Sequence, residues 1–512
     1  MKVTQGQPRP GGARLGFWAV MLLGIFAWAP ATYPGYWQGL EGFAPIFNVV
    51  EIRPLAHIAT TADFWRGAGG DAFLLARPLL VLGFSPTVAV RASFILMLIL
   101  GGLGMYSWLR PRLGDRAAGL AGLVYMLLPP VLATVYVRGS LSDAVILGLM
   151  PMALAGLSSY ASGRSLTGAI IAVSALLWMW RAQAGLALLV SLLLIGYGWF
   201  VERQRLSMVL VSVSSVAGAL SLWPVWSLQG PAPVRFHEHF LDMHQLLGAS
   251  GQNDAPFQVG FAALGLAIVS VWQWAGSAAD QLASDLRRLF RFCGTGCVLL
   301  IALTLSGSAI FWQWTGAERV LTYPWQTLLL AAPLLAALAG SLPALNAGFG
   351  TPTVWGTLVI LTILSSYSFL TADFTQLEPP DRPVAVFGPQ HNLVILDAEL
   401  TEREHPSQAE LRLTWQLLQP LDTDYNIFFQ AQTGDMVAPQ VVAQLDTQPL
   451  GENRPVTTWQ LGEILTTTYR LDLAELPAAA DLRYVFGYYD WRDGQRLPLT
   501  NGIDDKLVFY GQ

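Results

Sequence analysis

The sequence predicts an α-helical polytopic membrane domain of about 11 transmembrane helices in residues 1–372, followed by an extracytoplasmic all-β sandwich in residues 373–512. Hydrophobic residues make up 53% of the 512 residues and charged residues only 12%, and the mean hydropathy is +0.46. Residues 1–372 contain 20 Lys and Arg against 13 Asp and Glu, and residues 373–512 contain 9 against 21. The net charge therefore changes from +7 to −12. Such a change indicates lipid around the first domain and water around the second.

Long apolar runs predict the membrane helices. A helix needs about 20 apolar residues to cross the hydrocarbon core. The first run is followed by YPGYW and has no small-residue cleavage site, so we expect a retained anchor rather than a signal peptide. The runs beside RAQ at 181–183 are short and are also compatible with a re-entrant pair. The runs cover residues 15–35, 87–109, 117–135, 144–160, 166–181, 184–201, 206–228, 259–276, 292–312, 323–340 and 353–372.

Charged residues in the loops predict the orientation. Basic residues fall in alternate loops, and the positive-inside rule makes those loops and the N-terminus cytoplasmic. The other loops contain most carboxylates of this domain, and the C-terminal domain follows on that outer side. The predicted inner segments contain Lys2, Arg9, Arg14, Arg110, Arg112, Arg116, Arg164, Arg203, Arg205, Arg287, Arg288 and Arg291.

The longest outer loop, residues 36–86, contains helix signals of its own. Residues 43–60 combine apolar and charged residues at helical spacing, interrupted by Pro54, which predicts an interfacial helix. A glycine cluster and the pair Arg77-Pro78 then predict a loop and a second surface helix.

Alternating runs separated by turn residues predict the C-terminal sandwich, with about seven to nine strands. Aromatic residues in this domain are compatible with a sugar-binding platform or with the core, and the core is the favoured interpretation. These residues are Trp459, Tyr488, Tyr489 and Trp491. The predicted strands lie within residues 393–400, 409–419, 425–432, 466–473, 482–490 and 506–511.

Arg138 and Asp143 stand in the stretch TVYVRGSLSDA, between two apolar runs. A charge near the hydrocarbon costs a few kcal/mol, so such residues usually mark a partner or a site. Three interpretations stay open. The two side chains pair or cap the turn at Gly139, Arg138 binds a phosphate through its planar fork of donors, or neither applies.

Four segments resemble the GT-C superfamily of integral-membrane glycosyltransferases, and in particular its bacterial multi-spanning members. They are DFWRGAGGDAFLLARPLL at 63–80, GMYSWLRPRLGDRAAGLAGLVYMLLPP at 104–130, YVRGSLSDA at 136–144 and LTYPWQTLL at 321–329. The resemblance covers most of residues 15–372. It implies a bacterial plasma membrane, a polyprenyl-phosphate-linked sugar donor, and a glycan, lipid or protein acceptor at the outer face, with no nucleic acid involved.

Glycosyl transfer of this kind needs a carboxylate to deprotonate the acceptor hydroxyl and cations to hold the departing phosphate. Glu41 is the predicted base, because it matches the acidic residue that the family places after its first membrane helix, and Asp63 and Asp71 are its substitutes. The predicted substrate-binding residues are Arg77, Arg138, Asp143, Arg319 and Trp325.

No cofactor is required by this prediction, although imidazole and carboxylate groups in one outer loop are compatible with a divalent metal. Three histidines occur within RFHEHFLDMHQ at 235–245, but their spacing does not put them on one helical face, so a solvated or interfacial segment is favoured. The weak metal candidates are His237, His239, Asp242 and His244.

The chain departs from the family pattern at two points. No histidine follows Glu41, and Gln326 stands where many relatives have arginine after Pro-Trp. An alternative therefore stays open, a non-catalytic membrane scaffold or assembly subunit with the same fold. The sequence has no P-loop, no dinucleotide-binding glycine motif after a strand and no zinc-ligand spacing, so nucleotide-driven transport is unsupported.

Overall fold

The computed structural model describes residues 14–37, 39–50, 70–222, 236–248, 257–278, 283–370, 372, 374–380, 383–404, 407–434, 439–451, 454–473, 482–499 and 505–510. The chain divides into two compact units. The first is helical and comprises Met1–Gly39 and Glu51–Phe374, and the second comprises Leu40–Val50 and Thr375–Gln512. The assignment of residues 40–50 to the second unit is a feature that the sequence did not predict.

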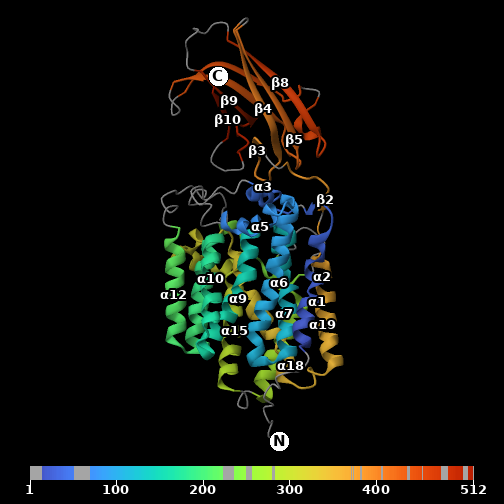
Figure 1. The fold of residues 1–512 in the computed structure, drawn as a ribbon, viewed down its shortest axis with the longest axis vertical. Coiled ribbons are helices and arrows are strands. Elements are labelled where there is room, and N and C mark those ends of the chain that lie inside the picture. Colours follow the sequence, from blue (N-terminus) through green and yellow to red (C-terminus); the bar gives the residue numbers. More distant parts are fainter. Residues whose placement is uncertain are drawn as a thin grey trace. The chain divides into compact units, whose positions relative to one another are not determined.

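Helices build the first unit (Figure 1). Their apolar faces pack against one another, and most of α17 is buried, whereas α12 keeps much of its apolar surface exposed, as a lipid-facing helix does. The principal helices are α1 (Leu15–Leu23), α2 (Ile25–Trp28), α5 (Arg77–Val81), α6 (Pro86–Leu113), α7 (Asp115–Met126), α8 (Pro129–Ala133), α9 (Leu141–Gly163), α10 (Leu166–Ala182), α11 (Ala184–Tyr197), α12 (Arg205–Leu220), α13 (Met243–Leu247), α14 (Phe261–Gln273), α15 (Ser284–Ala302), α16 (Ala309–Thr315), α17 (Thr327–Gly340), α18 (Leu342–Leu345) and α19 (Pro352–Ser366).

The protein is a multi-pass membrane protein, but the structure supports fewer crossings than the predicted 11. Among the described residues, five helices are long and apolar enough to span a membrane, or six if the bent pair of α7 and the segment Pro129–Arg138 is one span. Each predicted run contains a helix, yet several are shorter, and α15 begins with charged residues. The long helices are Leu15–Thr32, Pro86–Leu113, Leu141–Gly163, Ala184–Glu202 and Pro324–Leu345.

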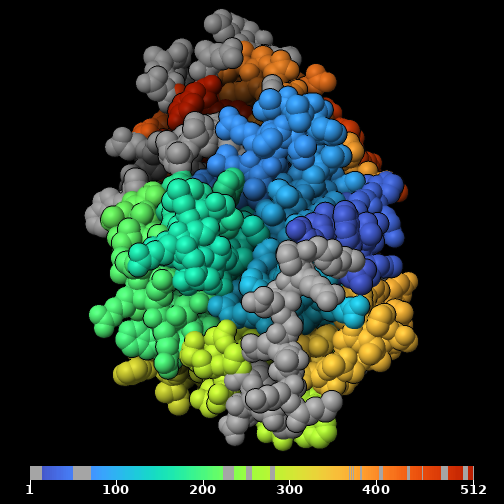
Figure 2. All heavy atoms as spheres, turned by 60° about the horizontal axis from the view of Figure 1, so that its bottom comes forward, coloured from blue at the N-terminus to red at the C-terminus, as the bar shows by residue number. Residues whose placement is uncertain are grey.

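Several of the predicted inner segments meet at one end of the helical unit. At this end, which we call the basic end, Asp115 accepts a hydrogen bond from the Gly16 N–H at 2.7 Å, and Arg112 pairs with Glu202 at 2.7 Å. Arg288 donates to the Val201 carbonyl at 3.1 Å at the same end. The basic loops predicted to be cytoplasmic therefore meet at one end. Figures 1 and 2 agree that α12 and α19 lie on opposite sides of this unit.

The first outer loop is described only in part. It contains β1 (Tyr36–Trp37), α3 (Ala44–Val50), the 3-10 turn η2 (Gly70–Leu75) and α5. Residues 51–69 lie outside the described residues, so the predicted interfacial helix at 43–60 is observed only as α3. The second predicted surface helix corresponds to η2 and α5.

The second unit is a β-sandwich of two four-stranded antiparallel sheets within the described residues. The strands are β3 (Ala385–Phe387), β4 (Leu393–Glu404), β5 (Ser407–Leu417), β6 (Tyr425–Thr433), β7 (Gln440–Thr447), β8 (Ile464–Asp472), β9 (Arg483–Asp490) and β10 (Leu507–Tyr510). One sheet has the order β3-β4-β5-β8 and the other β10-β9-β6-β7. All six predicted strands are present, and β3 and β7 were not predicted.

Alternating side chains of both sheets form the sandwich core. Trp415 of one sheet lies 5.9 Å from Tyr488 and 6.5 Å from Phe486 of the other, measured between ring centroids. Trp459 is 6% exposed and Tyr488 is fully buried, whereas Trp491 is 57% exposed. The favoured core interpretation therefore holds for Trp459 and Tyr488 and is wrong for Trp491, whose ring packs on the guanidinium of Arg492.

Lowering the pH from about 7 to about 4 is expected to destabilise the second unit by about 3 kcal/mol. Burial lowers the pKa of His391 from its usual 6.5 to about 4. The unfolded chain takes up a proton near pH 6.5, whereas the folded unit stays neutral until about pH 4. The contribution of the neutral, buried His391 to the stability of the second unit is therefore fully present above pH 6.5. It is lost progressively as the pH falls from 6.5 to about 4.

Pulse proteolysis of the full chain in detergent, scored by cleavage within residues 375–512, measures this dependence. The matched control is His391→Phe, which has no group that titrates here. A wild-type profile that is as flat as the control profile between pH 7 and pH 4 would contradict the prediction.

Candidate functional site

Arg138 and Asp143 face each other across a tight turn at the end of the helical unit opposite the basic end. The wide helical turn Thr134–Arg138 ends at Gly139, which has φ +69°. This left-handed conformation suits glycine. The helix α9 begins two residues later, and Asp143 in its first turn lies where the helix dipole favours negative charge. The guanidinium of Arg138 forms an ion pair with Asp143, and the Asp143 residue is 1% exposed.

Two glutamines complete the surroundings of the Asp143 carboxylate. The amide of Gln326 donates to it at 3.1 Å, and the amide of Gln183 lies at 3.5 Å. Gln326 is held in turn, because its Oε1 accepts the backbone N–H groups of Thr322 and Tyr323 at 3.1 and 3.2 Å. The carboxylate thus contacts residues that follow Asp143 by 40 and by 183 positions in the chain.

Aromatic rings cover the guanidinium of Arg138. Its central carbon lies 4.8 Å from the ring centroid of Trp325 and 5.5 Å from that of Tyr323, within cation–π range. The two rings stack on each other at 4.9 Å, and Trp325 is 7% exposed. The faces of the Trp325 ring are therefore engaged in these contacts, and its role in substrate binding stays a prediction.

The break between α10 and α11 links this cluster to Asp71. Arg181, at the end of α10, forms an ion pair with Asp71 and contacts the Ser221 carbonyl at 3.3 Å. Gln183, two residues later, reaches Asp143. Within the sequence RAQ, Arg181 therefore binds the Asp71 carboxylate and Gln183 contacts the Asp143 carboxylate. We call the group Asp71, Arg138, Asp143, Arg181, Gln183 and Gln326 the polar cluster.

The polar cluster contains one acceptor with no hydrogen-bond partner among the described residues, the Oε1 atom of Gln183. Beside the cluster, the indole N–H of the fully buried Trp37 is likewise without a partner in the described part of the chain. A Cβ on Gly139 would lie 3.7 Å from that indole nitrogen. Buried polar atoms without a partner in the protein are uncommon in folded proteins.

Of the remaining predicted residues, Arg77 and Arg319 belong to the helical unit but not to the polar cluster. Arg77, at the start of α5, and Arg319 are both exposed, and neither makes an ion pair with any described residue. Glu41 belongs to the second unit, where its carbonyl accepts the Ala44 N–H at 3.0 Å. Asp63 lies outside the described residues.

The side chains of the histidine-containing segment make separate contacts. No group of three or more His, Cys, Asp or Glu residues suited to a metal occurs in the described ranges. His237 pairs with Glu318 at 2.7 Å, His239 packs edge-on against Tyr323 at 5.0 Å, and His244 lies 4.0 Å from Asp242. His237, His239 and His244 thus each contact a different partner, and the metal candidates stay a prediction.

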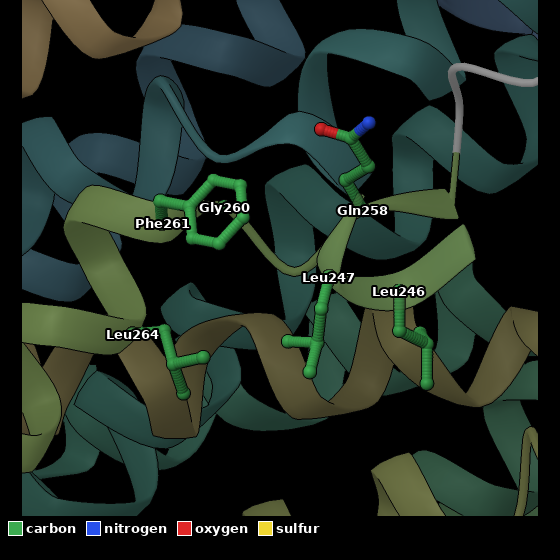
Figure 3. A pocket seen from close by; sticks show the side chains of 6 residues that line it. All are labelled: Leu246, Leu247, Gln258, Gly260, Phe261 and Leu264. Carbon is green, nitrogen blue, oxygen red and sulfur yellow. The ribbon is translucent and has the colours of Figure 1, made fainter. Parts of the chain in front are cut away.

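A shallow pocket lies between α13 and α14 (Figure 3). It encloses almost no volume, since its empty space of about 170 Å³ includes open solvent, so it is a surface hollow and not a ligand cavity. Figure 3 shows the Gln258 amide pointing away from Leu246 and Leu247. The neighbouring Phe257 ring lies 5.0 Å from Trp325, so the pocket adjoins the aromatic cover of Arg138.

Sequence reasoning missed Arg181 and Gln183 as members of the site. The signal was present, because RAQ interrupts two apolar runs, and polar residues at such a break need partners. It did not reveal which partners they have. Gln326 was noticed as a departure from the family pattern, but its contact with Asp143 was not predicted.

These features define the protein as a multi-pass helical membrane protein with a C-terminal antiparallel β-sandwich. No protein-family model matches the chain, and no curated protein matches it. Among solved structures, the chain is similar to the single-particle cryo-EM structure of the arabinofuranosyltransferase AftD from Mycobacteria, with 18% sequence identity and a TM-score of 0.44. The similarity covers 72% of this chain and 28% of that protein, so the chain spans just over a quarter of its length.

Proposed function

We propose that this protein is a membrane glycosyltransferase that moves a sugar from a polyprenyl-phosphate-linked donor to a glycan, lipid or protein acceptor at the extracytoplasmic face of a bacterial plasma membrane. The observation that carries the proposal is the meeting of separate sequence motifs. The segments 136–144 and 321–329, which resemble GT-C glycosyltransferases independently, join through Asp143 and Gln326. The segment 63–80 joins the same group through Asp71 and Arg181.

Within this proposal the polar cluster holds the loops, and exposed cations bind the donor. Arg138 and Arg181 already have carboxylate partners. Arg77 follows the Asp71 turn, and Arg319 lies four residues before Tyr323, so both extend from segments that the cluster fixes. Their exposed guanidinium groups suit the bidentate binding of a lipid phosphate.

Glu41 is the proposed general base. It would accept the proton of the acceptor hydroxyl while the cations stabilise the departing phosphate. Asp71 is less suited, because Arg181 occupies its carboxylate, and Asp63 stays the second choice. The proposal requires no metal, although a divalent ion bound with the donor is compatible with it.

A non-catalytic scaffold is the second candidate. The internal pairing of Arg138 with Asp143 and of Arg181 with Asp71 favours it, because these pairs stabilise the loops without any substrate. The two candidate functions differ in whether the exposed guanidinium groups of Arg77 and Arg319 bind a sugar donor.

Transfer measured in reconstituted vesicles against a panel of lipid-linked sugars tests the proposal. Arg77→Gln and Arg319→Gln are each expected to weaken donor use by about tenfold or more, because each removes a charge-assisted bond to phosphate worth about 1.5–3 kcal/mol. Arg164→Gln, an exposed arginine at the basic end, is the matched control. Absence of transfer by the wild-type protein with every donor would favour the scaffold.

A further inference from the structure

The segment that carries Glu41 belongs to the second unit, together with the C-terminal sandwich. It begins with a turn and continues as α3, whose first turn is closed by the Ile46 and Phe47 N–H groups donating to the Phe43 carbonyl at 2.9 and 3.1 Å. The side chains of Phe43, Ile46 and Phe47 are 1%, 1% and 3% exposed. A helix of seven residues is too short to be stable by itself, so it needs tertiary contacts to persist.

One such contact is a ring stack between Phe47 and His391. The ring centroids lie 5.4 Å apart and the planes differ by 9°. His391 is 4% exposed and has φ +58°, a left-handed conformation that costs a non-glycine residue about 1–3 kcal/mol. Neither of its ring nitrogens has a hydrogen-bond partner among the described residues. The histidine is therefore strained, and its ring serves here as a stacking surface.

A second contact is made at Gly42. Its φ is +51°, and a Cβ there would lie 2.6 Å from the Gln390 carbonyl oxygen. The chain passes so close to the loop that only glycine fits. This loop, residues 388–392, is itself fixed to the sandwich, because the Gly388 N–H donates to the Pro498 carbonyl at 2.8 Å and the Asn392 amide donates to the Pro420 carbonyl at 2.8 Å.

We propose that loop 388–392 of the sandwich positions Glu41, and that His391 is the positioning residue of this loop because its ring stacks on Phe47. Along the chain, Glu41 comes just after the point where the chain leaves the helical unit. It directly precedes Gly42, the first of the two contacts to the loop. The loop then fixes the backbone of the segment that carries the predicted base. The role assigned to Glu41 rests on the proposed function, whereas the holding of the segment does not.

Hydrogen exchange of the full-length protein in detergent tests the holding directly. In His391→Ala the Ile46 and Phe47 amides are expected to exchange at least about tenfold faster, because loss of the stack opens the segment locally. In the matched variant His391→Phe, which keeps a ring, protection is expected to stay as in the wild type. The amides of β4 and β5 serve to check that the sandwich remains folded.

Phe47→Ala removes the same ring stack from the other side. If His391→Ala unfolds the sandwich, the exchange rates of the Phe47→Ala protein test the proposal instead. Unchanged protection of residues 44–47 in a folded His391→Ala or Phe47→Ala protein would overturn the proposal. In the transfer assay both alanine variants are expected to lower kcat with KM for the donor unchanged, and His391→Phe to restore it. A wild-type protein that transfers no sugar would refute the proposed function but leave the exchange result valid.

Discussion

Asp143→Ala is expected to destabilise the helical unit by about 3–5 kcal/mol, because it removes the buried carboxylate that forms an ion pair with the Arg138 guanidinium. The substitution also removes the acceptor for the Gln326 amide. Arg138 is only 8% exposed, so water does not replace the lost partner. Thermal unfolding of the purified protein in detergent, followed by size-exclusion chromatography of the soluble fraction, measures the loss.

The double variant Arg138→Ala/Asp143→Ala separates the ion pair from ordinary packing. Because it removes both charges of this ion pair, it is expected to recover much of the stability that the single variant loses. An Asp143→Ala protein as stable as the wild type, or a double variant that loses the sum of both single effects, would contradict the role assigned to this pair.

Glu41→Gln is expected to reduce sugar transfer by a factor of about 100 to 10,000, the usual contribution of a positioned general base. The amide keeps the shape of the side chain but does not accept the proton. The amount of protein in the membrane is expected to stay normal, since the change alters one side chain of a turn. Initial rates in reconstituted vesicles, normalised to the amount of protein, provide the measurement.

Glu399→Gln on strand β4 of the sandwich is the matched control, because it makes the same chemical change away from the Glu41 segment. Its transfer rate is expected to equal that of the wild type. A Glu41→Gln protein that transfers sugar at the wild-type rate would contradict the role of Glu41 as the base. Another residue, with Asp63 the first candidate, would then be the base, or the scaffold would be favoured.

Hydropathy predicted the helical segments well because the backbone in lipid has to satisfy its own hydrogen bonds, which makes apolar runs helical. Alternation predicted six strands for a similar reason, since one face of each strand is buried. The strand β7 was missed because it lies at the edge of its sheet and follows no clear alternation, with Gln440 and Val441 both exposed. The strand β3 has only three residues, too few to show a period.

The polar cluster was only partly predictable, because its contacts join distant parts of the chain. The pairing of Arg138 with Asp143 is local, five residues apart, and was one of the interpretations left open. The contacts of Asp71 with Arg181 and of Asp143 with Gln326 depend on how the helices pack, which periodicity does not specify. The grouping of Glu41 with the sandwich depends on a ring stack and one close glycine contact, and neither leaves a signature in the sequence.

Cysteine labelling of intact cells with a membrane-impermeant maleimide tests the central claim, that the end bearing the polar cluster and the sandwich both face away from the cytosol. The native Cys293 and Cys297 are buried and give little background. Exposed positions are available in the sandwich, near the cluster and at the basic end, and the variants are Trp491→Cys, Arg319→Cys and Arg164→Cys. The account predicts that the first two are labelled in intact cells and the third only after lysis. Labelling of Trp491→Cys and Arg319→Cys from different sides of the membrane would contradict it.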